Sequence, residues 1–92
     1  MGAMRKSIHT AEYAALVKEL KRLRSAAKLT QRELATRLSV APSWVAKVES
    51  AERRIDVIEL CSLLMECGAD PKAVVEQVAR NIARSRRSGV RS

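Results

Sequence analysis

Basic side chains are the residues with which this sequence could do most chemistry. There are 18 Lys and Arg against 10 Asp and Glu, which gives a formal net charge of +8. Five arginines and no acidic residue fall between Gln77 and Ser92. A surplus of positive charge keeps a small protein soluble, and it also favours a polyanionic partner, usually a nucleic acid. The uneven distribution of the basic residues favours a nucleic-acid partner.

The residue sets that catalysis or metal binding would need do not occur. The single histidine, His9, precedes the first expected helix, and no Ser/His/Asp or Cys/His set accompanies it. Cys61 and Cys67 have no neighbouring ligands for zinc, and six residues apart on one helix they cannot easily form a disulfide. We therefore predict no catalytic residues, no metal and no cofactor. The chain also has no apolar run of transmembrane length and no signal peptide, which predicts a cytoplasmic protein without membrane contact.

The spacing of apolar residues predicts an all-α fold. Only three glycines and two prolines interrupt the chain, and apolar residues recur at helical intervals. We expect helices over about residues 11–27, 31–38, 42–50, 57–67 and 71–84. The apolar stripe of the first helix includes Tyr13, and that of the fourth consists of Val57, Leu60, Cys61 and Leu64. Their ends carry recognisable signals, including a capping box at Thr30 and Glu33, prolines at two first helical positions, and Gly68 after the fourth helix.

A chain of 92 residues is expected to form one domain. Met1-Gly2-Ala3 ahead of Met4 is typical of a tag remnant, so residues 1–9 are interpreted as that remnant and an N-terminal arm. Residues 10–84 form the helical domain. Residues 85–92 lack periodicity and are predicted to be a basic disordered tail. No site for a small-molecule effector is apparent.

Residues 31–50 read as one unit of two short helices. Ala35 is small enough to let two backbones approach closely, and Val40 lies in the connector between the helices. The remaining apolar positions, Val45 and Val48 among them, are expected to bind the second of these helices to the rest of the fold. Its outer face is then free to enter the major groove of DNA, which is wide enough for one helix.

On these residues the chain resembles the Xre, Cro and phage-repressor family of helix-turn-helix proteins. The matching stretches are Leu29-Thr-Gln-Arg-Glu-Leu-Ala-Thr-Arg-Leu38, Ser43-Trp-Val-Ala-Lys-Val-Glu-Ser50 and Glu52-Arg-Arg-Ile-Asp56. With the flanking helices, the resemblance covers about residues 12–68. It implies a compact five-helix bundle of the lambda-repressor-like type, in which helices 2 and 3 form the helix-turn-helix. It also implies a homodimer that binds an inverted-repeat operator in double-stranded DNA, most often as a repressor.

The resemblance assigns roles to individual residues. Gln31 matches a glutamine that clamps phosphate, with helix capping as the alternative. Pro42, Ser43 and Lys47 match positions that face base edges; Pro42 has no side-chain donor, whereas Lys47 could donate to guanine. For Trp44, partial core packing and contact with DNA are equally favoured. The full predicted DNA-binding set is Gln31, Arg32, Pro42, Ser43, Trp44, Lys47, Ser50, Arg53 and Arg54, in which Arg53 and Arg54 contact phosphates.

Other positions are assigned structural roles. Arg24 and Glu49 match an ion pair that ties the first helix to the end of the third. Ser39 and Ala51 stand where the family usually has glycine, so each is expected to need a positive φ. The last helix carries an apolar stripe that consists of Val74, Val75, Val78 and Ile82. This stripe could close the core of the monomer or contact a second copy of the chain, and dimerisation is favoured.

Two alternative functions use the same fold. An antitoxin would bind both its own promoter and a toxin protein, and a neighbouring toxin-like reading frame would favour it. A protein-interaction module would have lost DNA binding, which the placement of Gln31, Lys47, Arg53 and Arg54 argues against. The preferred interpretation is a stand-alone regulator associated with the nucleoid.

Overall fold

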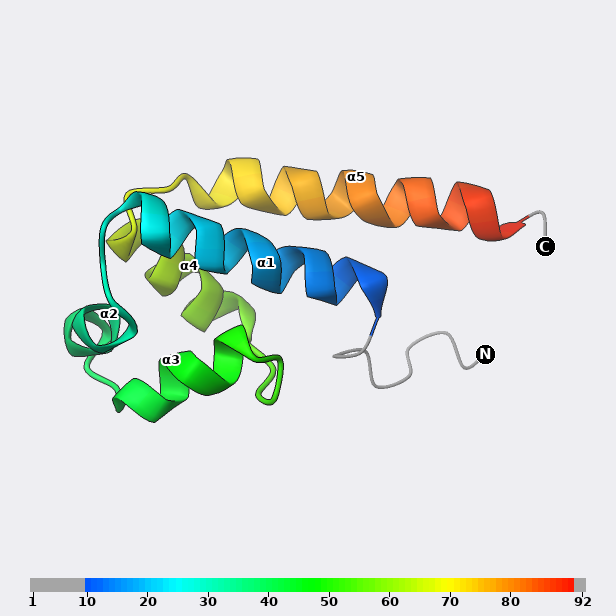
Figure 1. Cartoon of the computed structure of the whole chain (residues 1–92). Helices are drawn as coiled ribbons and strands as arrows, with labels where there is room; N and C mark the ends of the chain where they lie inside the picture. The colour runs from blue at the N-terminus through cyan, green and yellow to red at the C-terminus, as the bar shows by residue number, and fades with distance from the viewer. Residues whose placement is uncertain (1–9, 91–92) are drawn as a thin grey trace.

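The computed structural model of the chain consists of five helices (Figure 1). It describes the backbone of residues 10–90 and the side chains of residues 10–87. The helices are α1 (Ala11–Ala26), α2 (Gln31–Leu38), α3 (Pro42–Glu49), α4 (Val57–Glu66) and α5 (Pro71–Val90). The described residues contain no strand, so the all-α prediction is confirmed. The predicted arm over residues 1–9 lies outside the described part.

Two of the helices begin at capping boxes. At the start of α2, the Thr30 hydroxyl accepts the Glu33 N–H at 3.0 Å, and the Glu33 carboxylate accepts the Thr30 N–H at 2.8 Å. Asp56 and Glu59 make the same reciprocal pair at the start of α4, at 2.7 and 3.0 Å. Each box satisfies backbone donors that a helix N-terminus would otherwise leave unpaired. These local bonds explain why both helices begin where the sequence predicts.

The connections after α2, α3 and α4 all use a left-handed residue. Ser39 has φ 60°, Ala51 has φ 64° and Gly68 has φ 74°. The positive φ expected at Ser39 and Ala51 is therefore confirmed. Lys28, between α1 and α2, also has a positive φ of 61°, which the sequence did not predict.

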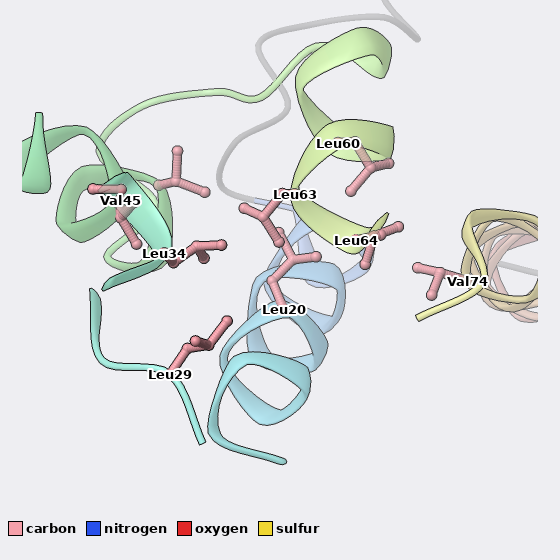
Figure 2. Close-up of a cluster of buried hydrophobic side chains, with 10 residues drawn as sticks. Leu20, Leu29, Leu34, Val45, Leu60, Leu63, Leu64 and Val74 are labelled. Carbon is pink, nitrogen blue, oxygen red and sulfur yellow. The ribbon is translucent and has the colours of Figure 1, made fainter. Parts of the chain in front are cut away.

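Side chains from every helix meet in one hydrophobic core. Figure 2 shows Leu20 of α1, Leu34 of α2, Val45 of α3, Leu64 of α4 and Val74 of α5 converging on it. Within the core, α2 packs against α3 and α4, while α5 packs against α1 and α4. As a result α5 and α3 lie on opposite sides of α1 (Figure 1).

The buried face of α4 differs from the predicted stripe. The sequence placed Val57, Leu60, Cys61 and Leu64 on that stripe, but the structure buries Leu60, Leu63 and Leu64 and leaves Val57 exposed. The reason is that α4 packs against α2 as well as α5, which turns Leu63 inward. Periodicity alone cannot tell which neighbours a helix will have.

The C-terminal helix is longer than predicted. The sequence predicted a helix ending at residue 84 and a disordered tail over residues 85–92, whereas α5 continues to Val90. Arginine is a good helix former, and the turn that follows Arg84 also has a partner on α1. The Glu12 carboxylate is hydrogen-bonded to Ser85 and attracted by Arg86, and these interactions hold the pKa of Glu12 below its usual value. Residues 91–92 lie outside the described part.

Candidate nucleic-acid interface

One face of α3 is held in the core and the other is open. Val45 and Val48 are fully buried, while Pro42, Ser43, Lys47 and the following Ser50 are exposed. An α-helix with its side chains is about 10–12 Å across, which fits the major groove of DNA, about 12 Å wide. The helix therefore presents a polar face of groove size, backed by a rigid apolar face.

Glu49, the last residue of α3, is the centre of a buried polar cluster. Its carboxylate oxygens accept from Arg24 Nε at 2.6 Å and Nη2 at 3.0 Å, and Oε1 also accepts from the Gln31 amide at 2.9 Å. Arg24 Nη1 donates to the Leu29 carbonyl at 2.8 Å. The ion pair implied by the resemblance is thus present, and Gln31 joins it. The cluster ties together α1, the start of α2 and the end of α3.

Gln31 makes a contact that the sequence did not predict, and it does not cap α2. Its side chain binds Glu49, and the N-cap of α2 is Thr30. A half-buried amide in this position is oriented at the very start of α2, where phosphate contact was predicted. The geometry leaves that prediction untested.

The electrostatics of this cluster favour an ionised Glu49. Burial raises the pKa of this carboxylate, but the hydrogen bonds from Arg24 and Gln31 and the positive charges of Arg24 and Lys21 together outweigh burial and hold the pKa below its usual value. A charged Glu49 keeps Arg24 paired inside the protein. This arginine therefore has a structural role, because it joins α1 to the end of α3.

Arg53 is held by contacts within the protein. Its guanidinium Nη1 and Nη2 each donate to a carboxylate oxygen of Glu59 at 3.1 Å, and Nη1 also donates to the Arg54 carbonyl at 2.8 Å. The same guanidinium lies over the Trp44 ring, with its Cζ 5.0 Å from the ring centroid. Hydrogen bonding from Arg53 lowers the pKa of Glu59. Trp44 is half-buried and packs against the core, so the core-packing interpretation of Trp44 has structural support.

Tyr13 braces the same loop from α1. Its hydroxyl accepts the Ile55 N–H at 3.1 Å and donates to the Arg53 carbonyl at 3.4 Å. The sequence predicted only that Tyr13 lies on the apolar stripe of the first helix. A phenol hydroxyl needs a polar partner when it is partly buried, and that requirement was the one available signal for this contact.

The comparisons with known proteins agree with this geometry. The family model of a helix-turn-helix domain matches residues 15–80. An XRE-family like protein from Pseudomonas syringae pv. tomato str. DC3000 is 46% identical with a TM-score of 0.74, over 79% of this chain and 89% of that chain. This chain is an XRE-type helix-turn-helix DNA-binding protein. The structure of the clp gene regulator ClgR from Corynebacterium glutamicum shares the fold, at 24% identity and a TM-score of 0.66, over 85% of this chain and 83% of that one. No curated protein matches this sequence.

The predicted DNA-binding residues of this XRE-type protein divide into two groups. The exposed group consists of Arg32, Pro42, Ser43, Lys47, Ser50 and Arg54. The second group is engaged inside the protein and consists of Gln31, Trp44 and Arg53. Ser50 is exposed, but its hydroxyl also donates to Glu52 at 2.9 Å.

Two further properties complete the description of the described residues. None of their His, Cys, Asp and Glu side chains form a group of three that could hold a metal ion. In the same part of the chain, no helix has the length and apolar character required to cross a membrane.

Proposed function

We propose that this XRE-type protein is a transcriptional regulator that binds an inverted-repeat operator in duplex DNA as a homodimer and acts as a repressor. The observation that carries the proposal is the orientation of α3. Val45 and Val48 lock one face into the core, so Ser43 and Lys47 point outward from a rigid support. A side chain reads a base reliably only when its backbone is held in place.

The residues then divide into those that read sequence and those that hold the backbone of DNA. Lys47 donates to the acceptors of guanine in the major groove, and Ser43 contacts a neighbouring base or phosphate. Arg32 and Arg54 contact phosphates, which adds affinity but no sequence preference. Arg53 and Trp44 position the loop that carries Arg54.

The homodimer follows from the size of the reading helix. A single α3 reaches only a few base pairs, whereas two copies related by a two-fold axis read half-sites about 34 Å apart. The regulator represses by occupying the operator, and this places it with the nucleoid in the cytoplasm.

Selection from a pool of random duplexes tests this function. The full chain is incubated with the pool, bound duplexes are recovered, and the enriched sequences are aligned. The expected result is an inverted repeat whose half-sites are spaced by about one helical turn. A pool that stays random, or an enriched motif without two-fold symmetry, would contradict the proposal.

A further inference from the structure

Arginines dominate the C-terminal half of α5, and the proposed function does not use them. Arg80, Arg84, Arg86 and Arg87 are all exposed, and no acidic residue follows Glu76 in the chain. The sequence predicted a disordered tail beyond Arg84, whereas the helix continues through this region. The helix therefore sets the positions of these arginines relative to one another.

Three of these arginines form a stripe along one side of α5. Arg80, Arg84 and Arg87 are four and three residues apart, and residues with these spacings are neighbours on a helix surface. Their backbones span about 10 Å along the helix axis. Arg86 lies off this line, where Glu12 of α1 attracts it. We call Arg80, Arg84 and Arg87 the arginine stripe.

The arginine stripe points away from α1. The side of α5 that faces α1 is marked by Ser85, which is hydrogen-bonded to Glu12 of α1. Successive residues of a helix are about 100° apart, so each residue of the stripe lies at least about 100° around the helix from Ser85. All three arginines are exposed, whereas Val74 on the core side of α5 is buried. The stripe is therefore open to a partner.

Carboxylates of the protein neutralise only part of the charge of the stripe. Arg80 Nη2 lies 3.0 Å from Glu76 Oε2, but both side chains are 64% exposed, and water screens such a pair. Glu12 and Arg84 border the same hollow, and the Glu12 carboxylate is hydrogen-bonded to Ser85. A surplus of positive charge therefore remains along this side of α5.

The phosphates of duplex DNA match this surplus. Arginines three and four residues apart on a helix repel each other, and a row of anions along the stripe relieves that repulsion. A guanidinium group binds phosphate oxygens through two parallel hydrogen bonds. Duplex DNA carries one negative charge per about 1.7 Å of its axis, so a stretch as long as the stripe offers several phosphates.

We infer that the arginine stripe binds the phosphates of a second DNA duplex while α3 holds the first. In Figure 1, α1 lies between α3 and α5, and α1 packs against both. Packed helices are about 8–10 Å apart, so the axes of α3 and α5 are separated by roughly 16–20 Å. Because the stripe also points away from α1, a straight duplex held by α3 is out of its reach. The inference goes beyond the proposed function and takes from it only that α3 holds the first duplex.

Other polyanions fit the arginine stripe less well. Proteins that bind single strands stack the bases on aromatic side chains, but the only aromatic residues of this chain are Tyr13 and Trp44, and neither is on α5. A helix that lies on a membrane has large apolar side chains opposite its basic face and inserts them into the lipid. Ile82 is 36% exposed, and such a large apolar side chain does not recur beyond it among the described residues of α5. A regulator on its operator is also surrounded by further DNA, which raises the local concentration of duplex.

A bridging experiment tests the arginine stripe. A duplex that carries the selected inverted repeat is fixed to beads, the full-length protein is bound to it, and a short fluorescent duplex of random sequence is added. Because the inverted repeat occupies α3 of both copies, the fluorescent duplex must be held by another surface. The fluorescence retained on the beads, divided by the amount of bound protein, gives the affinity for the second duplex.

Two double variants with the same change of charge are compared. Arg84→Gln/Arg87→Gln removes two cations of the arginine stripe. Lys18→Gln/Lys72→Gln removes two exposed cations elsewhere, one on α1 and one in the first turn of α5. Glutamine is a good helix former, and circular dichroism checks that both variants keep their helices.

We expect the parent and the lysine variant to bind the fluorescent duplex alike, and the arginine variant to bind it at least about tenfold more weakly. The slope of log affinity against log salt should be smaller by about two units for the arginine variant, because two phosphate contacts are lost. Equal affinities of the two variants would overturn the inference. So would retention of vesicles that contain phosphatidylserine in place of the second duplex.

The same experiment separates this inference from the proposed function. A parent that stays on the beads but captures no second duplex refutes the arginine stripe alone. A parent that does not stay on the beads contradicts the role of α3. The stripe is then tested by fluorescence anisotropy of the random duplex titrated with free protein, where equal affinities of the two double variants would again overturn the inference.

Discussion

The ion pairs Arg24–Glu49 and Arg22–Glu19 have almost the same length, at 2.6 and 2.7 Å, but different surroundings. The side chains of the first pair are 15% and 3% exposed, whereas those of the second are 64% and 37% exposed. Water screens an exposed ion pair and leaves it only a small contribution to the stability of the fold. Breaking a buried ion pair is costly, because it leaves a buried charge without a partner. The buried pair is therefore expected to contribute more to the free energy of unfolding than the exposed pair, although the two distances are similar.

A pair of alanine variants measures that difference. Glu49→Ala should lower the free energy of unfolding by about 3 kcal/mol, because Arg24 and the Gln31 amide lose their partner in a mostly buried site. Glu19→Ala should change it by less than about 1 kcal/mol. Urea denaturation followed by circular dichroism gives both values. Equal losses would show that Glu49 does not hold the three helices together.

Lys47 and Arg54 test the division between reading sequence and holding the DNA backbone. Lys47→Ala should change which base is preferred at one half-site position, whereas Arg54→Ala should weaken binding to all duplexes. Arg54→Ala should also reduce the slope of log affinity against log salt by about one unit. Both effects are measured by fluorescence anisotropy with selected and random duplexes. If both variants bind every duplex as the parent does, these roles are wrong.

At the scale of elements, the connections store strain where the family usually has glycine. Ala51 adopts φ 64° with a Cβ, whereas Gly68 adopts φ 74° without one. The left-handed conformation costs a residue with a side chain about 1–2 kcal/mol, part of which is offset by the greater freedom of glycine in the unfolded chain. The loop after α3 is therefore less stable than it could be.

Opposite substitutions at these two positions should have opposite effects. Ala51→Gly is expected to raise stability by about 0.5–1 kcal/mol and the Tm by a few degrees. Gly68→Ala should lower stability by a similar amount, although nothing lies within 4 Å of the added Cβ. Thermal melts monitored by circular dichroism distinguish the two. A lower Tm for Ala51→Gly would mean that this methyl group makes a packing contact worth more than the strain.

At the scale of the whole molecule, the two predicted interactions use separate sides. The polar face of α3 lies across α1 from α5 (Figure 1), which carries Val75 and Ile82, the exposed residues of the stripe predicted to dimerise. One molecule can therefore meet DNA and a second copy without competition between them.

The global stability should fall in acid because several carboxylates are held in ionised form. Glu49 is the most buried of them, and its folded-state pKa lies below the value of 4.5 that it has when unpaired. Its contribution to stability is therefore complete above about pH 4.5 and is lost as the pH falls through the folded-state pKa. Urea unfolding at a series of pH values should show this decline for the parent and a smaller decline for Glu49→Gln. An equal decline would assign the acid sensitivity to other groups.

Much of the fold follows from local sequence. Capping boxes at Thr30 and Asp56, Pro42 at the first position of α3 and Gly68 after α4 all act within a few residues, so the five helices could be located before the structure was known. The outward side of α3 was predictable too, because Val45 and Val48 are three residues apart and must face one way. The resemblance added the pairing of Arg24 with Glu49, which spacing alone does not reveal.

Contacts between distant residues were decided only by the tertiary structure. Gln31 meets Glu49 across 18 residues and Tyr13 meets Ile55 across 42, so no local pattern encodes either contact. The same is true of Arg53, which the sequence left facing DNA and the fold places between Trp44 and Glu59. The exposure of Val57 also depends on which helices pack against α4. Helix ends are set by hydrogen bonds between residues close together in the sequence, so the sequence alone predicts them. The contacts of a side chain with distant residues depend on how the helices pack together, so only the tertiary structure decides them.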